Sequence, residues 1–531
     1  YTKAFQNITE SSNPGSVMSS YNATTVSRSG EYIYNFIPSL SNSYLLKDLL
    51  RRSWGFKGYV TSDCWSISDF IYGHKTHADS ISAASDAVLH GTDLECGNIY
   101  NSLDQAVKSG FITEDQIDIS LKKLFKIRFR LGMFDPADKN PYAHISENVL
   151  ESDAHRQQAL KMARQSMVLL KNDKSLLPLS RKYKKIVLTG PNANNETTQL
   201  GNYNGFPTEN TTLLEALQKE KGIEVVYDQL TDFTRMLQET DTDKLLEKYK
   251  DADLIIYAGG ISPLLEGEQG DAGNGKEEGF YEGDRTSIAL PKVQTEVMKK
   301  LKELGKPLIF VCMSGSAMAF NWEAENAQAI IQAWYGGQAA GTALADILFG
   351  RYNPSGKLPL TFYRSDNDLP DFNDYSMTNR TYRYFKGDVL YPFGYGLSYT
   401  SFKYKKLEIP AQIQTGDSVR VQVTVSNTGK RAGEEVVQLY LSHKEIAPEA
   451  PNCQLVAFKK VKLDAGETQT ISFMLAPRSL AYVEDAGGVT EPDGTVTFYA
   501  GNVCPSAPQR FTSQVLSKKV QLTGNPRYFM Y

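Results

Sequence analysis

The sequence predicts a multidomain α/β protein that ends in an all-β domain, and three observations support this prediction. Its 531 residues are too many for one hydrophobic core, so two to four domains are expected. Up to about residue 400, short apolar runs alternate with amphipathic helical patterns, which indicates parallel β/α units. After Phe402, short strands follow one another without helices, which indicates a β-sandwich of immunoglobulin or fibronectin-III type.

The first predicted domain, residues 1–135, contains strand–helix units. Thr113-Glu-Asp-Gln116 has the pattern of a capping box and predicts a long closing helix that ends near Gly132. The polar run from Asp135 to Asn140 predicts a linker. The other elements expected in this domain are strands at 17–22, 58–63 and 92–96 and helices at 45–54 and 81–90.

The second predicted domain, residues 136–400, begins with a helix at 154–170 and then alternates strands and helices. Its strands are almost entirely apolar, which is typical of a parallel sheet covered on both faces. They are expected at 185–189, 223–227, 254–257, 308–313 and 329–334, with helices at 291–304 and 341–348. Residues 401–531 form the predicted β-sandwich.

Composition narrows the class of protein. Hydrophobic residues make up 41%, charged residues 22%, and the net charge is −4, so no nucleic-acid partner is expected. The longest apolar runs are far below the roughly 20 residues that cross a bilayer, so no membrane partner is expected either. Five cysteines match no zinc-type spacing, and no metal is expected.

One aspartate ends a predicted strand. Gly58-Tyr-Val-Thr-Ser-Asp63 places Asp63 at the carboxyl end of a parallel strand, where β/α barrels build their active sites. The alternative is that Asp63 caps the helix that follows.

A long acidic, glycine-rich loop follows the strand at 254–257. It carries Glu266 and Glu268 and extends to Arg285, outside the carboxyl end of a parallel strand, where open α/β sheets bind ligands. The alternative is a solvated surface loop. Two carboxylates from different domains would fit glycoside hydrolysis, in which one attacks the anomeric carbon and the other protonates the leaving oxygen.

Several longer motifs occur in a fixed order. They are Ser16-Val-Met-Ser-Ser-Tyr-Asn22, Leu49-Leu-Arg-Arg-Ser-Trp-Gly-Phe-Lys-Gly-Tyr-Val-Thr-Ser-Asp63, Gly91-Thr-Asp-Leu-Glu-Cys-Gly97, Ala333-Trp-Tyr-Gly-Gly-Gln338 and Leu390-Tyr-Pro-Phe-Gly-Tyr-Gly-Leu-Ser-Tyr-Thr400. With these motifs the sequence resembles glycoside hydrolase family 3 from about residue 15 to about residue 477. The resemblance implies the C-terminal part of a (β/α)8 barrel, an α/β sandwich and a fibronectin-III-like β-sandwich.

The resemblance also assigns the two carboxylates. It places the nucleophile on Asp63 and the acid/base on Glu268, with Glu266 beside it in the substrate site, and it implies retention of configuration. An insertion at 269–283 separates this pair from Asp284-Arg285 and leaves Glu277, Glu278 and above all Glu282 as rivals for the acid/base role.

Further site residues follow from the resemblance. Met18 and Tyr21 are expected to line the sugar pocket and Trp65 to form an aromatic wall, with core packing as the alternative for Met18 and Trp65. In xylosidase-like relatives a disulfide joins the positions of Cys64 and Cys96. Such a bridge would brace the loop that holds Asp63 and implies a secreted or periplasmic protein.

The resemblance implies a retaining exo-acting β-glycosidase that acts on terminal non-reducing sugars of an oligosaccharide, β-D-xylose first and β-D-glucose next, without a cofactor. Family members begin with a full barrel, whereas this sequence starts near its last strands. The expectation is therefore that the N-terminal half-barrel, with further sugar-holding residues, either is left out of this sequence or is supplied as a separate segment. The alternative is a catalytically incomplete carbohydrate-binding or scaffold fragment.

Overall fold

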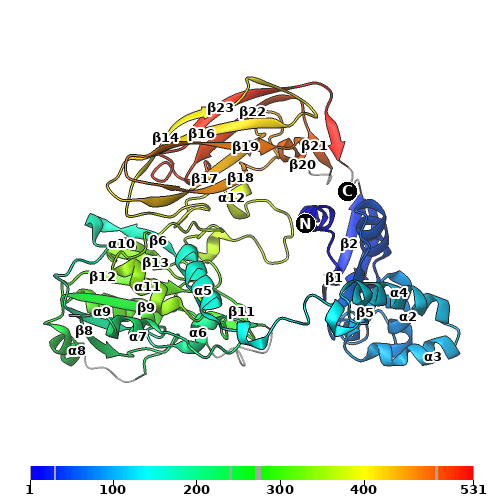
Figure 1. The fold of residues 1–531 in the computed structure, drawn as a ribbon, viewed down its shortest axis with the longest axis horizontal. Helices are drawn as coiled ribbons and strands as arrows, with labels where there is room; N and C mark the ends of the chain where they lie inside the picture. Colours follow the sequence, from blue (N-terminus) through cyan, green and yellow to red (C-terminus); the bar gives the residue numbers. More distant parts are fainter. Residues whose placement is uncertain (1, 29–30, 238–241, 269–276, 485–487, 530–531) are drawn as a thin grey trace. The chain divides into compact units, whose positions relative to one another are not determined.

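The computed structural model describes residues 2–28, 31–237, 242–268, 277–484 and 488–529 (Figure 1). The chain forms two compact units. The first comprises residues 1–147 with the short segments 483–490 and 528–531, and the second comprises residues 148–482 and 491–527. The predicted fold class is confirmed, because strand–helix units precede an α/β sandwich and an all-β domain.

The first unit is built on a parallel sheet of order β1-β4-β5. The strands are β1 (Ser16–Ser19), β4 (Tyr59–Cys64) and β5 (Leu94–Cys96), and the helices are α1 (Lys3–Ser12), α2 (Ser80–His90), α3 (Leu103–Lys108) and α4 (Glu114–Arg130). The predicted capping box is present at α4, where Thr113 and Gln116 exchange side-chain to backbone hydrogen bonds.

Two local features of this unit were not predicted. The segment Tyr44–Ser53, expected as an α-helix, is a π-helix. An antiparallel hairpin of β2 (Ala23–Arg28) and β3 (Glu31–Pro38) follows β1. Its first strand holds three successive β-branched residues, Thr24, Thr25 and Val26, which are themselves a strand signal.

The packing of β4 determines which way Asp63 faces. Val60 is buried against Leu46, Leu49 and Leu50 of the π-helix. Because successive side chains of a strand point to opposite faces, Thr61 and Asp63 lie on the other face, where both are partly exposed.

The second unit begins with a sheet of order β6-β13-β12-β9-β7-β8. Its strands are β6 (Val168–Asn172), β7 (Lys185–Thr189), β8 (Glu224–Asp228), β9 (Leu254–Gly260), β12 (Leu308–Met313) and β13 (Ala329–Gln332). Pairing is parallel except at the edge, where β6 runs antiparallel to β13.

The edge strand corrects the prediction of one helix at 154–170. The helix α5 is Asp153–Ser166, and the chain then turns into β6. Leu169 packs in one core of the sheet, whereas Val168 and Leu170 pack in the other. The short apolar run thus alternates between two buried faces, a pattern that periodicity alone does not distinguish from a buried helix.

Helices cover both faces of this sheet. One core contains Val297, Met298 and Leu301 of α9, and the other contains Leu213 and Leu217 of α7 with Leu344 of α11. The helices of this domain are α5, α6 (Glu196–Leu200), α7 (Leu213–Gln218), α8 (Thr242–Tyr249), α9 (Lys292–Lys302), α10 (Asn321–Asn326), α11 (Ala340–Leu348) and α12 (Thr381–Tyr384), with a hairpin of β10 (Phe280–Tyr281) and β11 (Asp284–Arg285).

The all-β domain packs two sheets face to face, of orders β14-β16-β19 and β15-β23-β22-β17-β18. Its strands are β14 (Phe402–Glu408), β15 (Gln412–Gln414), β16 (Val419–Asn427), β17 (Gly433–Ser442), β18 (Gln454–Leu463), β19 (Thr468–Leu475), β22 (Gly494–Gly501) and β23 (Leu516–Thr523). A separate sheet of order β20-β21-β24 consists of β20 (Tyr482–Val483), β21 (Val489–Glu491) and β24 (Arg527–Phe529). A buried ion pair of Lys357 with Glu435, 3.4 Å apart, joins this domain to the α/β sandwich.

Within the described ranges no helix is both long and apolar enough to span a membrane.

Candidate active site

Asp63 lies at the carboxyl end of β4, as expected, and its surroundings hold it in place. The backbone N–H of Cys64 donates to Asp63 Oδ1 at 2.7 Å. The Asp63 carbonyl accepts from the hydroxyl of Ser66 at 2.8 Å, which closes the turn after the strand. The carboxylate is partly exposed, so it can meet a substrate while its backbone is fixed.

A disulfide between Cys64 and Cys96 ties the end of β4 to the end of β5. Two hydrogen bonds reinforce this tie: the Trp65 N–H donates to the Cys96 carbonyl at 2.6 Å, and the Cys96 N–H donates to Ser62 Oγ at 2.9 Å. Trp65 has a φ of 66° and a side chain that is 58% exposed. The indole next to Asp63 is therefore presented to solvent and is not part of a core within the first unit.

Met18 and Tyr21 lie beside the same strand end. Met18 of β1 pairs in parallel register with Thr61 of β4, so both side chains share the face that carries Asp63, and Met18 is 58% exposed. The Tyr21 hydroxyl donates to the Cys64 carbonyl. The structure thus brings Met18, Tyr21 and Trp65 to the residue predicted as nucleophile.

A buried charge cluster supports the beginning of β4, and the sequence alone did not single it out. Asp93 is buried and accepts from Arg51 at 2.6 Å, from Lys123 at 2.6 Å and from the Val60 N–H at 2.9 Å. Burial lowers the pKa of both Arg51 and Lys123, and the charge of Asp93 opposes that shift. Asp93 lies inside the motif Gly91–Gly97, and this position is the sequence signal from which its role could have been predicted.

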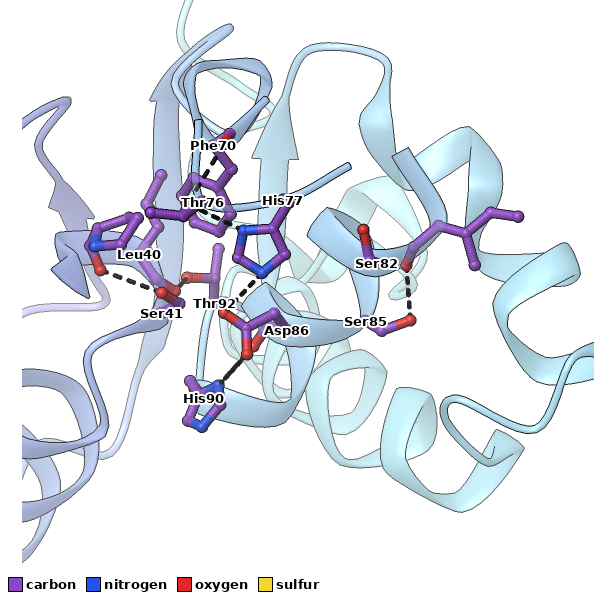
Figure 2. Close-up of polar contacts among 12 residues, drawn as sticks. Leu40, Ser41, Phe70, Thr76, His77, Ser82, Ser85, Asp86, His90 and Thr92 are labelled. Atoms are coloured by element: carbon purple, nitrogen blue, oxygen red, sulfur yellow. Dashed lines mark hydrogen bonds and ion pairs between the residues drawn. The ribbon is translucent and has the colours of Figure 1, made fainter. Parts of the chain in front are cut away.

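A second polar cluster lies on α2 (Figure 2). Asp86 contacts His90 Nδ1 at 2.9 Å and His77 Nε2 at 3.3 Å, and His77 Nδ1 lies 3.0 Å from the Thr76 hydroxyl. The hydrogen bond that His90 donates to the Asp86 carboxylate raises the pKa of His90. These contacts fasten the segment that precedes α2 to the helix itself.

In the second unit, Glu266 is held by the protein. Its carboxylate accepts from the Gly315 N–H, the Ser316 hydroxyl and the Tyr335 hydroxyl, the last at 2.5 Å. Arg285 donates to the Ser316 hydroxyl at 2.6 Å and to the Ala317 carbonyl at 2.7 Å. Burial, then the nearby charge of Glu266, raises the pKa of Tyr335. Glu266 therefore fastens the loop to the chain that follows β12.

Glu268 differs from Glu266, although only one residue separates them. Its side chain is exposed, and its Oε1 accepts a hydrogen bond from the Tyr203 hydroxyl. Gly283 packs against the backbone of Glu268: a Cβ at position 283 would overlap the Glu268 carbonyl oxygen, and the φ of 99° also favours glycine. The two ends of the segment 269–283 therefore meet at Glu268.

The rival glutamates have other surroundings. Glu282 has a φ of 50° and, with Gly283, forms the two-residue turn between β10 and β11. Glu277 accepts a hydrogen bond from the Thr234 hydroxyl and lies 3.9 Å from Arg235. Residues 269–276 of the insertion lie outside the described ranges.

A carboxylate at the end of a parallel strand in one unit, and a second one on a loop at the carboxyl edge of a doubly wound sheet in the other, fit the class of glycoside hydrolases that use two carboxylates. The comparisons with known proteins agree. Residues 1–127 match the glycosyl hydrolase family 3 N-terminal domain, residues 167–399 its C-terminal domain and residues 435–503 a fibronectin type III-like domain. The chain belongs to glycoside hydrolase family 3.

Its relatives are β-xylosidases and β-glucosidases by name. A xylan 1,4-β-xylosidase of Xylanibacter ruminicola is 33% identical, over 84% of this chain and 68% of its own length. A periplasmic β-glucosidase of Salmonella typhimurium is 34% identical, over 84% of this chain and 62% of its own. The chain thus spans about two thirds of the length of these relatives.

Solved structures show the same likeness. A β-glucosidase from Erythrobacter marinus has a TM-score of 0.83 at 30% identity, and the match covers 98% of this chain and 69% of that one. A family 3 exo-β-xylosidase in complex with a xylobiose aziridine probe has a TM-score of 0.84 at 28% identity, with 99% and 68% covered.

Proposed function

We propose that this chain is a retaining exo-acting β-glycosidase that removes terminal non-reducing β-linked sugars, with Asp63 as nucleophile and Glu268 as acid/base. The observation that carries the proposal is the contrast between a braced, partly exposed Asp63 at a strand end and an exposed Glu268 on the loop after β9. Each carboxylate lies, within its own domain, where such folds build their active sites.

The reaction would run in two displacements. In the first, the Asp63 carboxylate bonds to the anomeric carbon while the C–O bond to the leaving group breaks, and Glu268 gives its proton to the leaving oxygen. In the second, Glu268 takes a proton from water as the water oxygen replaces Asp63 at the same carbon. Atoms and charge balance without a cofactor.

Glu268 is preferred over its neighbours on structural grounds. The Glu266 carboxylate accepts three hydrogen bonds from the protein, so it is already engaged in holding the loop. Glu277 is engaged by Thr234 on another segment. Glu282 lies in a tight turn, and it remains the rival to test.

For the sugar, we propose β-D-xylose first and β-D-glucose next. The names of the relatives include both activities, and a xylosidase is among those with substantial identity. Since xylose and glucose differ by one hydroxymethyl group, discrimination of only about 1–3 kcal/mol is expected. Glycosidase relatives also make an oligosaccharide the expected substrate class.

We also propose a secreted or periplasmic location. The disulfide between Cys64 and Cys96 supports it, because such bridges persist in oxidising compartments. A relative named a periplasmic β-glucosidase supports it as well.

The test measures hydrolysis of p-nitrophenyl β-xyloside and β-glucoside by the unmodified chain and by Asp63→Ala, Glu268→Ala and the matched control Glu282→Ala. Asp63→Ala should abolish turnover. Glu268→Ala should slow it by about 10²–10⁴-fold, and azide should restore turnover with a β-glycosyl azide as product. Normal turnover by Glu268→Ala together with slowed turnover by Glu282→Ala would assign the acid/base role to Glu282 instead.

The alternative function is a carbohydrate-binding or scaffold fragment without turnover. The match of the family's N-terminal-domain model to residues 1–127 favours the hydrolase over this alternative. Absence of turnover by the unmodified chain on both aryl glycosides, with retained binding of xylo-oligosaccharide, would support the scaffold.

A further inference from the structure

We infer that Tyr203 is a positioning residue that orients the carboxyl group of Glu268 for proton transfer. This inference rests on the proposed acid/base role of Glu268. Its starting observation is the hydrogen bond from the Tyr203 hydroxyl to Glu268 Oε1, which joins two loops of the α/β sandwich.

The conformation of Tyr203 is unusual. Its backbone has a φ of 54°, a left-handed conformation that is uncommon for a bulky residue and is found at functional sites. Its side chain is 87% exposed, so burial of the ring does not stabilise this conformation. The hydrogen bond to Glu268 is an interaction that this conformation makes possible.

The loop that carries Tyr203 is fastened on both sides. On one side Asn202 Nδ2 donates to the Pro263 carbonyl at 3.1 Å, next to the acidic loop. On the other side the Thr208 N–H donates to the carboxylate of Glu151 at 2.9 and 3.0 Å. The backbone that carries Tyr203 is therefore held in place next to the acidic loop.

The other charged groups of the acidic loop and its surroundings have contacts of their own. Glu266 is held by its three donors, and Arg285 donates to Ser316 and Ala317. Glu282 lies in the turn beside Gly283, whose backbone packs on that of Glu268. Tyr203 differs from these groups because its hydroxyl reaches the Glu268 carboxylate itself.

The chemistry follows from the geometry of this bond. A hydroxyl that donates to one oxygen of a carboxylate restricts the rotation of the carboxyl group. Glu268 must deliver a proton to the leaving oxygen in the first displacement and take one from water in the second. Tyr203 holds the carboxyl group of Glu268 in one orientation for both transfers.

The experiment compares kcat/KM of Tyr203→Phe for two substrates: a 2,4-dinitrophenyl β-xyloside, whose leaving group departs without a proton, and xylobiose, whose leaving group needs the proton of Glu268. Tyr281→Phe, which changes an exposed tyrosine of the neighbouring hairpin, is the matched control. Loss of the hydrogen bond should lower kcat/KM about 10-fold or more for xylobiose and much less for the aryl xyloside. Tyr281→Phe should leave both values unchanged.

The outcomes separate this inference from the proposed function. Unchanged or equally lowered kcat/KM for the two substrates in Tyr203→Phe, with Glu268→Ala impaired and rescued by azide, would overturn only the role of Tyr203. Normal activity of Glu268→Ala would overturn the proposed acid/base itself. A merely structural role of Tyr203 would lower kcat/KM for both substrates alike.

A separate observation carries a second inference: we infer that Cys453 and Cys504 form a disulfide in the β-sandwich. Both side chains are buried, and their sulfur atoms lie 3.3 Å apart. A bond of about 2.05 Å would require the sulfurs to approach by about 1.3 Å. The Cys64–Cys96 disulfide indicates that the chain matures where thiols are oxidised.

The bridge would reinforce a contact between two domains of the second unit. Cys453 precedes β18 and Cys504 follows β22. The Cys504 N–H donates to the Phe393 carbonyl at 3.1 Å, and Leu455, two residues after Cys453, donates to the Tyr382 hydroxyl at 3.1 Å. Formation of the bridge consumes an external disulfide. The thiols of Cys453 and Cys504 are oxidised to a disulfide, while the external disulfide takes up their two protons and two electrons and becomes two thiols.

Thiol counting tests this inference. The chain is folded in a buffer of oxidised and reduced glutathione, denatured without reductant and alkylated with iodoacetamide. Of its 5 cysteines, only Cys312 should react with iodoacetamide before reduction, and all 5 should react after reduction. In Cys453→Ser, the released partner Cys504 should react as well. Three or more labels on the unmodified, unreduced chain would overturn the inference.

Discussion

The two proposed catalytic carboxylates are held in different ways. Asp63 lies on a strand whose end is fixed by a disulfide and a backbone N–H and whose beginning is held by a buried charge cluster. Glu268 lies on a loop and is held by a tyrosine hydroxyl and by the packing of Gly283. A nucleophile stays ionised and must be held in a fixed position. An acid/base gains or loses a proton in each half of the catalytic cycle, so its surroundings must accept both protonation states.

Among the variants that test this comparison, Asp93→Ala should have the largest effect. Asp93→Ala leaves Arg51 and Lys123 buried without their shared carboxylate, which should cost about 3–5 kcal/mol of unfolding free energy. Denaturant unfolding measures the cost. Asp104→Ala, which removes an exposed i,i+4 pair, is the control and should change stability little. A loss below about 1 kcal/mol for Asp93→Ala would refute the bracing role.

Removal of the Cys64–Cys96 bridge should have the next largest effect. The two cysteines are 32 residues apart, and a bridge across that separation should stabilise the folded state by about 3–4 kcal/mol, because it lowers the conformational entropy of the unfolded chain. The double variant Cys64→Ser/Cys96→Ser should therefore unfold at lower denaturant and should lose kcat, because Asp63 adjoins Cys64. Equal activity with lowered stability would show that the bridge braces the fold and not the nucleophile.

Gly283→Ala tests the acid/base side of the comparison. The added Cβ would overlap the Glu268 carbonyl oxygen, so the loop must shift. We expect roughly a 10-fold or greater loss of kcat/KM, the effect of a small misplacement of a catalytic group, with a stability loss of about 1 kcal/mol from the backbone strain. Gly222→Ala, where φ is positive but the space is open, is the matched control for strain alone. Equal activity losses in both variants would contradict the positioning argument.

The smallest expected effect is a pH dependence from α2. The pKa of His90 is raised by its hydrogen bond with Asp86, so the contact contributes stability below the ordinary histidine pKa of about 6.5 and loses it as pH rises through the higher folded value. The imidazole is more than a third exposed, so the contribution should be well under about 1 kcal/mol. The difference in unfolding free energy between the unmodified chain and His90→Gln should therefore shrink between about pH 6 and pH 8. A constant difference would contradict the assignment.

The sequence predicted regular elements better than the surroundings of the carboxylates. The strands at 58–63, 185–189 and 308–313 were predicted because their apolar runs are clear and their helices are well separated. The edge strand β6 was missed, since its short apolar run directly follows a helix and fits either structure.

The partners of the acidic loop could not be predicted. Glu266 is held by Gly315, Ser316 and Tyr335, which are distant in sequence and meet it only because β9 and β12 are neighbours in the sheet. The same holds for Tyr203 and Glu268. Nothing in local residue patterns distinguishes the held glutamate from the exposed one.

The closure at Gly283 has a consequence for how such a chain can diversify. Because the segment 269–283 begins and ends at the same point of the backbone, its length is decoupled from the position of Glu268. Lengthening such a closed loop costs little free energy, about 0.6 kcal/mol for each doubling. Evolution or design can therefore change the length and composition of the insertion while Glu268, the proposed acid/base, keeps its position.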